Sequence, residues 1–209
     1  MYMKILALEF SSNQRGVAVS EDENILSTVN TDNFKTSPLS LIDEALRKAC
    51  LDRNTIETIT LSIGPGSYTG IRSAIATAQG WELARNIKIL PISSPEILAA
   101  TARFQGQTGM TDFIINAQRQ EYYHSTWNLT EENQNEVKPL SIIDTIEATK
   151  LSAFGPDIKE LPKVTQLYPD VAKLAQLAAN RTNFQLGEEI EPIYLRATEF
   201  VKSIPFRRL

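Results

Sequence analysis

The first half of the chain alternates between strand-type and helix-type patterns of apolar residues. Three β-rich runs at residues 3–10, 15–20 and 25–30 are separated by short polar turns, which predicts an antiparallel meander. Helices are then predicted at residues 38–50, 67–85 and 94–103, with strands at 58–63 and 87–92 between them. The resulting order, β-β-β-α-β-α-β-α, is typical of a ribonuclease-H-like α/β core.

Two of these helices have a serine followed by proline at their predicted start, in Ser37-Pro38 and Ser94-Pro95. A capping residue followed by proline in the first helical turn is a common way to begin a helix. Four apolar residues, spaced by three and four, predict one buried stripe on the first helix: Leu39, Ile42, Leu46 and Ala49. The single cysteine, Cys50, follows this stripe, and we expect it to be a small core residue.

A polar segment with two glycines, residues 105–109, predicts a boundary between two parts of the chain. We therefore expect an N-terminal lobe at 1–104 and a smaller C-terminal lobe at 105–209. In the second part, residues 113–117 and 121–129 are predicted strands joined by a tight turn, and a helix is predicted to begin near Asp170.

Charge and composition narrow the function classes. The formal net charge of −4 argues against a broad nucleic-acid-binding face, which needs clustered Lys and Arg. Lys202, Arg207 and Arg208 form one small basic cluster, for which a solvated tail is the simpler interpretation. The first apolar run is too short for a signal peptide, and no run reaches the ~20 apolar residues of a membrane span. We expect a cytoplasmic protein without membrane contact.

The glycine-rich segment from Gly64 to Gly70 joins a predicted strand to a predicted helix. Backbone N–H groups at a helix start favour an anion, although the Walker sequence is absent. Two interpretations stay open: a structural turn capped by Ser67 or Thr69, and a phosphate cradle. The candidate anion-binding or nucleotide-binding residues are Ser11, Ser12, Gly64, Gly66, Ser67 and Thr69.

The helix after this turn carries small residues on one face, at Gly70, Ser73, Thr77, Gly80 and Ala84. Small side chains let another helix approach closely, while an adjoining apolar face can pack on the sheet. The helix at 38–50 could cover the small face by itself, or both helices could also meet a partner in a four-helix contact. The candidate interface residues are Leu39, Ile42, Leu46, Gly70, Arg72, Ser73, Ala76, Thr77, Gly80 and Ala84.

The run Ile63-Gly64-Pro65-Gly66-Ser67-Tyr68-Thr69-Gly70-Ile71-Arg72, followed by Ala78-Gln79-Gly80, resembles the hallmark of the TsaB (YeaZ-type) family. Weaker matches are Ile5-Leu6-Ala7-Leu8, Glu121-Tyr122-Tyr123 and Pro192-Ile193-Tyr194-Leu195-Arg196. The resemblance implies an α/β protein of the actin-like ATPase (ASKHA) superfamily, with two ribonuclease-H-like lobes of which the second is reduced.

The same resemblance implies a non-catalytic subunit of the complex that attaches threonylcarbamoyl to tRNA adenosine. Its partners would be the catalytic TsaD subunit, bound through the first two helices, and the ATPase TsaE. We also expect self-association when the partner is missing, indirect contact with tRNA, no cofactor required by this chain, and ATP or ADP, if present, at the partner interface.

The sequence departs from the family pattern at three places. Glu9 stands where the family usually has Asp, Lys35-Thr36-Ser37 replaces the usual His-Ser pair, and Asn116-Ala117-Gln118 replaces Asp-Ala-Arg. These changes weaken any nucleotide-handling role of the positions concerned. They leave the predicted interface unchanged.

The sequence can be compared with three enzymatic alternatives. An actin-like ATPase or small-molecule kinase would need a carboxylate near the first turn to manage Mg²⁺ and phosphate, and Glu9 has a longer side chain than Asp. The catalytic transferase of the superfamily binds metal through two His on one helix, whereas this chain has only His124, on a predicted strand. A peptidase would need His124 and a serine in a triad, and no nucleophile-elbow motif is present. We therefore expect neither catalytic nor metal-binding residues.

Overall fold

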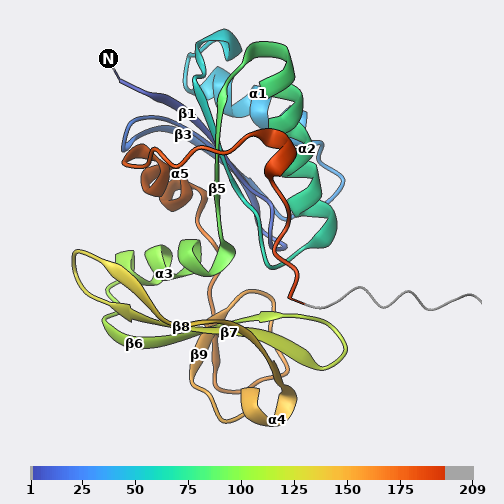
Figure 1. Cartoon of the computed structure of the whole chain (residues 1–209), viewed down its shortest axis with the longest axis vertical. Helices are drawn as coiled ribbons and strands as arrows, with labels where there is room; N and C mark the ends of the chain where they lie inside the picture. The colour runs from blue at the N-terminus through green and yellow to red at the C-terminus, as the bar shows by residue number, and fades with distance from the viewer. Residues whose placement is uncertain (1, 196–209) are drawn as a thin grey trace, which may run out of the picture.

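A computed structural model describes residues 2–195 of the chain, folded around two five-stranded sheets (Figure 1). The first sheet has the order β3-β2-β1-β4-β5. Its strands are β1 (Lys4–Glu9), β2 (Arg15–Glu21), β3 (Asn24–Thr31), β4 (Thr58–Ser62) and β5 (Lys88–Ile92). β1 is central, since it pairs antiparallel with β2 and parallel with β4.

Helices cover both faces of the first sheet. The apolar side chains of its central strand point alternately to one face and to the other. Leu6 and Leu8 of β1 share a core with α1 (Pro38–Lys48) and α2 (Tyr68–Arg85). Ile5 and Ala7 point to the other face, where α5 (Val171–Ala179) packs. Burial on both sides explains why β1 is a continuous apolar run.

The second sheet repeats this topology on a smaller scale. Its order is β10-β9-β6-β7-β8, in which β6 pairs antiparallel with β7 and parallel with β9. The elements are β6 (Gly109–Asn116), β7 (Glu121–Leu129), β8 (Gln134–Asp144), α4 (Thr145–Ala148), β9 (Ala153–Gly155) and β10 (Val164–Gln166). When the strands of each sheet are numbered in chain order from the first strand of that sheet, both sheets have the order 3-2-1-4-5. Two ribonuclease-H-like lobes, the second reduced, confirm the predicted actin-like fold.

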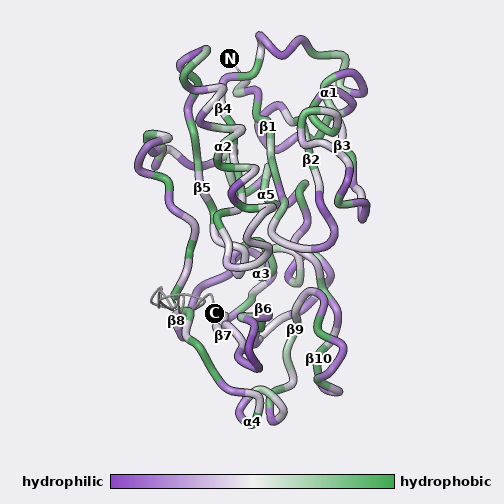
Figure 2. The backbone as a smooth tube through the Cα atoms, turned by 90° about the vertical axis from the view of Figure 1, so that its right-hand side faces the viewer, coloured by the Kyte–Doolittle hydropathy of each residue, from purple (hydrophilic) through white to green (hydrophobic). Residues whose placement is uncertain are grey.

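The helices do not follow the order of the strands. α3 (Ser94–Phe104) precedes β6 but packs on the second sheet, through Leu98, Ala99 and Ala102. α5 follows that sheet but returns to the first one. Figures 1 and 2 both place α3 between the two sheets. The division of the chain at residue 104 stays a prediction, because α3 lies before this point but packs on the second sheet, and α5 lies after it but packs on the first.

Several local expectations need correction. The third helix is capped by Ser93, whose Oγ accepts the Glu96 N–H, and Ser94 already lies inside it. Cys50 is exposed, with a left-handed backbone just past α1, so it is not a core residue. On α1 the buried stripe is Leu41, Ile42, Ala45 and Leu46, while Leu39 is 59% exposed.

The sequence did not indicate β8, α4, β9 or β10. β8 has mostly exposed residues and two irregularities in its pairing with β7, so it lacks a clear alternation. Within residues 2–195, none of the helices combines the length and apolar character needed to cross a membrane. The basic cluster at Lys202, Arg207 and Arg208 lies outside the described residues, as does Arg196 of the family-like C-terminal motif.

Candidate functional site

Helix α2 presents a face of small residues to solvent. Ser67 caps its start by accepting the Gly70 N–H, and its inner side is formed by Ile71, Ala74, Ile75 and Ala78. On the opposite side, Ala76, Gly80 and Ala84 are exposed, with Ser73 and Thr77 half-buried beside them. A Cβ placed on Gly80 would meet no atom of the described chain within 4 Å. Helix α1 therefore leaves this face open.

Two predicted interface residues on α1 are buried within this chain and do not reach its surface. Ile42 and Leu46 are only 2% and 5% exposed, because they lie in the core between α1 and the first sheet. Leu39, one turn earlier, is available to a partner. Gly70 has an internal role: a Cβ there would lie 1.9 Å from the Phe10 carbonyl oxygen.

Leu83, which is not among the residues predicted from the sequence, is 88% exposed and borders the small face of α2. Leu186, at 57% exposure, lies beside the same helix, since the neighbouring Gly187 N–H is bound by Glu82. Exposed leucines are not detectable by periodicity when a helix carries apolar residues on most sides. The available signal in the sequence was that Leu83 does not continue the spacing of the apolar face formed by Ile71, Ala74, Ile75 and Ala78.

The segment at residues 183–195, here called the strap, fixes the other flank of α2. Its Gln185 N–H donates to the Ile89 carbonyl, and Ile193 N–H donates to the Ile63 carbonyl, each at 2.9 Å. Between these points, Glu82 accepts the Gly187 N–H at 2.9 Å and Gln79 donates to the Gly187 carbonyl at 2.8 Å. The strap therefore ties the edge of β5 to the start of α2, along the red segment of Figure 1.

A stack of three side chains joins the strap to the first turn of α2. The Tyr68 and Tyr194 rings lie 5.6 Å apart, and the Arg72 guanidinium lies 4.5 Å from the centre of the Tyr68 ring. Burial raises the pKa of Tyr194, while Arg72 opposes that shift. Arg72 thus has a cation–π contact within the chain.

The glycine-rich turn is packed tightly against the end of β1. Ser67 N–H donates to the Ser11 carbonyl at 2.7 Å. A Cβ on Gly66 would lie 2.1 Å from that same carbonyl oxygen, and the positive φ of Gly66 also favours glycine. The structural interpretation of this turn therefore accounts for Gly66 and Gly70, which approach backbone carbonyls closely, and for the Ser67 cap.

An open cavity of about 1050 Å³ lies between the lobes. The first lobe contributes residues 11–13, 66–68 and Tyr194, and the second contributes residues 115–119, Glu121, Tyr123, Pro156 and Asp157. We call this cavity the inter-lobe cleft. Of the predicted anion-binding residues, Ser11, Ser12, Gly66 and Ser67 line it, whereas Gly64 is buried against Ile71 and Thr69 is exposed outside it.

Glu9 does not line this cleft. Its side chain is fully buried and accepts hydrogen bonds from the Ser11 N–H and hydroxyl at Oε1, while Oε2 has no hydrogen-bond partner among the described residues. Burial raises the pKa of Glu9 to about 7, against the opposing effect of these hydrogen bonds. A carboxylate turned inward in this way is not placed to hold a cation in the cleft.

The actin-like fold implies a magnesium nucleotide between the lobes, and the donors in the cleft fit one poorly. Ser11 and Ser12 hydroxyls are bonded to Glu9 and to the Gln14 carbonyl, and Ser67 is used as a cap. Arg119 is the single cationic side chain among the lining residues. Among residues 2–195, no three His, Cys, Asp or Glu lie close enough together to hold a metal ion.

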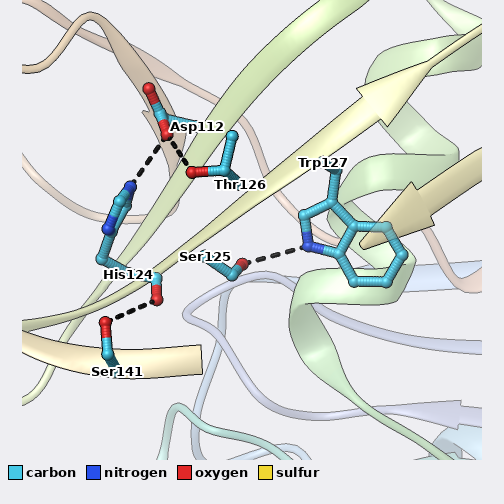
Figure 3. Close-up of polar contacts among 6 residues, drawn as sticks. All are labelled: Asp112, His124, Ser125, Thr126, Trp127 and Ser141. Carbon is cyan, nitrogen blue, oxygen red and sulfur yellow. Dashed lines mark hydrogen bonds and ion pairs between the residues drawn. The ribbon is translucent and has the colours of Figure 1, made fainter. Parts of the chain in front are cut away.

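His124 belongs to a small polar cluster on β6 and β7, shown in Figure 3. Its Nε2 lies 2.9 Å from Asp112 Oδ1, which also accepts the Thr126 hydroxyl. The Ser125 hydroxyl accepts the Trp127 indole N–H, and the Ser141 hydroxyl donates to the His124 carbonyl at 3.5 Å. None of the hydroxyl groups in this cluster is positioned as a nucleophile activated by His124. The geometry does not support a peptidase triad.

Two lobes of ribonuclease-H type facing a common cleft define an actin-like α/β protein. A family model described as "TsaD: tRNA N6-adenosine threonylcarbamoyltransferase" matches residues 28–192. The chain is 24% identical over 194 residues to the tRNA threonylcarbamoyladenosine biosynthesis protein TsaB of Haemophilus influenzae, covering 81% of this chain and 82% of that one. It is 27% identical over 124 residues to the TsaB of Bacillus subtilis, covering 58% and 53%.

The structure is similar to that of YeaZ from Pseudomonas aeruginosa, with a TM-score of 0.77, 20% identity, and coverage of 92% of this chain and 100% of that one. A second Pseudomonas aeruginosa structure, of an uncharacterized protein with similarity to peptidase YeaZ, gives a TM-score of 0.79 at 22% identity, with coverage of 93% and 100%. The chain belongs to the family of this TsaD model and is a member of its TsaB (YeaZ) type.

Proposed function

We propose that the chain is a non-catalytic subunit in tRNA threonylcarbamoyladenosine biosynthesis and that it binds a TsaD-type catalytic subunit. The contact surface is the exposed face of α2 together with Leu39 at the start of α1. On α2 it comprises Arg72, Ser73, Ala76, Thr77, Gly80, Leu83 and Ala84. The partner supplies the catalytic groups.

One observation carries this proposal: an 18-residue helix leaves a continuous face of small residues and a leucine open to solvent. Exposed apolar surface is disfavoured on a monomer unless it has a use. Small side chains permit the short interaxial distance at which two helices pack ridges into grooves. Arg72, at the edge of this face, adds a charged group that remains exposed.

The proposal is tested by co-purification with the TsaD-type subunit from the same genome. Gly80→Leu places a bulky side chain at the centre of the face, where it meets no atom of its own chain, so the fold should be retained. We expect at least a tenfold loss of partner retention, because close helix approach is blocked. Ser152→Leu is the matched control, since it puts the same side chain at an exposed position of the second lobe.

Equal retention of both variants would refute the interface.

A second assay addresses the absence of catalysis: the isolated chain should show no ATP turnover, yet it should restore adenosine modification when added to the transferase. ATP hydrolysis by the chain alone, dependent on Mg²⁺ and lost in Glu9→Gln, would instead favour a standalone actin-like ATPase or kinase.

Further associations follow from the same proposal. The open face of α2 would support self-association when the partner is missing, since the same face of small residues on two copies can meet across a two-fold axis. A TsaE-type ATPase would join the complex, with any ATP or ADP held at the contact between subunits. Contact with tRNA would be made chiefly by the partner, in keeping with the net charge of −4.

A further inference from the structure

A buried carboxyl group lies where the ends of β1 and β4 meet the starts of α2 and α3. Glu9 is fully buried, and its Oε1 accepts both the N–H and the hydroxyl of Ser11. Its Oε2 has no hydrogen-bond partner among residues 2–195. An unpartnered carboxylate oxygen is costly to bury, and most of this cost is removed when the oxygen carries a proton.

Two serine hydroxyls continue from this carboxyl group into the interior. The Ser62 hydroxyl is close enough to Glu9 to oppose the rise that burial causes in the pKa of the carboxyl group. Ser62 Oγ lies 2.8 Å from Ser94 Oγ, both side chains are fully buried, and either hydroxyl can be the donor. A neutral Glu9 can therefore donate to Ser62, which then donates to Ser94. An ionised Glu9 reverses the chain, so that Ser94 donates to Ser62 and Ser62 donates to Glu9.

The backbone around Glu9 is held by neighbours of the same residues. Ser67 N–H donates to the Ser11 carbonyl, and Ser94 N–H donates to the Gly64 carbonyl, each at 2.7 Å. The region connected in this way, here called the joint, comprises residues 9–12, 62–67 and 94. A change in the charge of Glu9 therefore reaches the turn before α2 and the first turn of α3.

Neutral groups surround Glu9 within the part of the chain that the structure describes. Burial raises its pKa, and the opposing groups are the N–H and hydroxyl of Ser11 and the hydroxyl of Ser62. The charged side chains of the surrounding elements near the joint are Arg15 on β2, Arg72 on α2, Glu96 on α3, Asp170 and Lys173 at the start of α5, and Asp157 beside Asn13. None of these charges is among the causes that act on the pKa of Glu9. The charge of Glu9 therefore depends on pH and not on an ion pair within the chain.

We propose that Glu9 is a pH-sensitive switch: its neutral form stabilises the joint, and its ionised form loosens the start of α2. Ionisation leaves a buried charge without a cation beside it. This charge becomes hydrated when the joint opens toward the inter-lobe cleft, which Ser11 and Ser12 line. Because burial raises the pKa of Glu9 to about 7, the change falls between pH 6 and 8.

The switch has a consequence for partner binding. The first turn of α2 begins at the joint and carries Tyr68 and Arg72, and Arg72 lies at the edge of the proposed contact surface. A loosened joint displaces this edge, so the neutral form of Glu9 binds the partner more tightly. This consequence rests on the proposed function, whereas the switch itself involves this chain alone.

Hydrogen exchange of the isolated full chain tests the switch at amides of the joint. The exchange rates of the Ser11, Ser67 and Ser94 amides are measured at pH 6 and 8 in the wild type and in Glu9→Gln, whose side chain stays uncharged. The ratio of the two chains at each pH removes the intrinsic effect of pH on exchange. Since an open joint lets Glu9 ionise near its ordinary pKa of 4.5, the ratio of wild type to variant should rise about tenfold from pH 6 to 8.

Two further variants separate a titrating group from general loosening. Ser62→Ala removes a hydroxyl that lowers the pKa of Glu9, so the transition should move to higher pH. Glu132→Gln, at an exposed carboxylate of the second lobe, is the control and should follow the wild type. A ratio that is constant from pH 6 to 8 would overturn the switch. Exchange at the joint no faster than at the buried residues 113–115 would also overturn it, because only the whole fold would then open.

Partner binding provides the second measurement. With a pKa of about 7, the neutral fraction of Glu9 falls from about 90% at pH 6 to about 10% at pH 8, so the affinity for the TsaD-type subunit should fall roughly tenfold relative to Glu9→Gln. Parallel affinities of the two chains across this range would overturn the effect on the partner. Retention of the partner by Gly80→Leu would instead refute the proposed interface, and the exchange ratio would still decide whether Glu9 is a switch.

Discussion

Glu9 ends the central strand β1, where it is fully buried and receives two hydrogen bonds from Ser11. The Ser11 carbonyl in turn accepts the Ser67 N–H, so the position of Glu9 influences the start of α2. The extra methylene of Glu, compared with the Asp usual in the family, accompanies a carboxylate that points inward and away from the cleft. In this chain, Glu9 therefore contributes to local structure at the end of β1 and does not face the cleft.

Replacing Glu9 with Gln should alter how stability depends on pH. Since burial raises the pKa of Glu9 from 4.5 to about 7, the folded state binds a proton that the unfolded state releases between these values. The wild-type chain therefore loses stability as pH rises from about 4.5 to 7, by roughly 3 kcal/mol, whereas Glu9→Gln has no such term. Urea unfolding of both chains at pH 4.5 and 8 measures the difference. A difference that is independent of pH would contradict this assignment.

Gly80 and Gly70 lie on the same helix and should respond in opposite ways to alanine. Gly80→Ala should raise the free energy of unfolding by roughly 0.5–1 kcal/mol, because the new Cβ meets no atom and glycine is a poor helix former. Gly70→Ala would place its Cβ against the Phe10 carbonyl and should cost about 1–3 kcal/mol. If the small face receives a partner helix, Gly80→Ala should also weaken retention of the TsaD-type subunit. A stabilised variant with unchanged retention would argue against close helix approach at this position.

At the scale of elements, α2 is held from three sides and open on the fourth. The first sheet lies beneath it, α1 contacts one flank, and the strap occupies the other. The strap is fixed to α2 mainly by the bonds from Glu82 and Gln79 to Gly187, where a Cβ would lie 2.3 Å from Glu82 Oε2. The orientation of the open face therefore depends on the strap.

Removing the Glu82 carboxylate should release this strap. Glu82→Ala deletes the acceptor of the buried Gly187 N–H, and a hydrogen bond to a charged group contributes about 1–3 kcal/mol. Unfolding in urea should shift by that amount, and hydrogen exchange should accelerate at Gly187. Glu188→Ala removes the neighbouring exposed carboxylate as a control and should change stability by less than about 0.5 kcal/mol. Similar behaviour of the two variants would show that the strap is held elsewhere.

The sequence predicts elements well where burial is two-sided or strongly periodic. All five strands of the first sheet, α1, α2 and α3 were predicted within a few residues, because apolar runs and capping residues mark them. The second sheet was harder, since β9 and β10 are three residues each and β8 is largely exposed. Orientation was the main error on α1: Leu39 fits the apolar spacing as well as Leu41 does, and only tertiary packing decides between them.

At the scale of the whole molecule, the two lobes are interleaved by their helices. α3 leaves the first lobe to cover the second sheet, and α5 returns to cover the first. They are also joined to each other, by the ion pair of Arg181 with Glu96 and by the Asp170 N–H, which donates to the Thr101 hydroxyl. This exchange was beyond sequence analysis, because a helix pattern indicates an apolar face but not the sheet that receives it. The same limit applies to the cleft, whose walls come from positions up to 183 residues apart, Ser11 and Tyr194.

Across the mouth of the cleft, Asp157 of the second lobe accepts the Asn13 N–H of the first lobe and the Tyr168 hydroxyl. Because Asp157 makes a direct hydrogen bond between the lobes at this edge, Asp157→Ala should widen the range of inter-lobe distances while costing only about 1–2 kcal/mol of stability. Spin labels at Cys50, which is exposed in the first lobe, and at an introduced Ser152→Cys in the second lobe can measure this by pulsed electron resonance. Asp144→Ala is the matched control, since Asp144 caps α4 within a single lobe. We expect a broader distance distribution in Asp157→Ala alone. Identical distributions in both variants would mean that the packing of α3 and α5 fixes the lobes without Asp157.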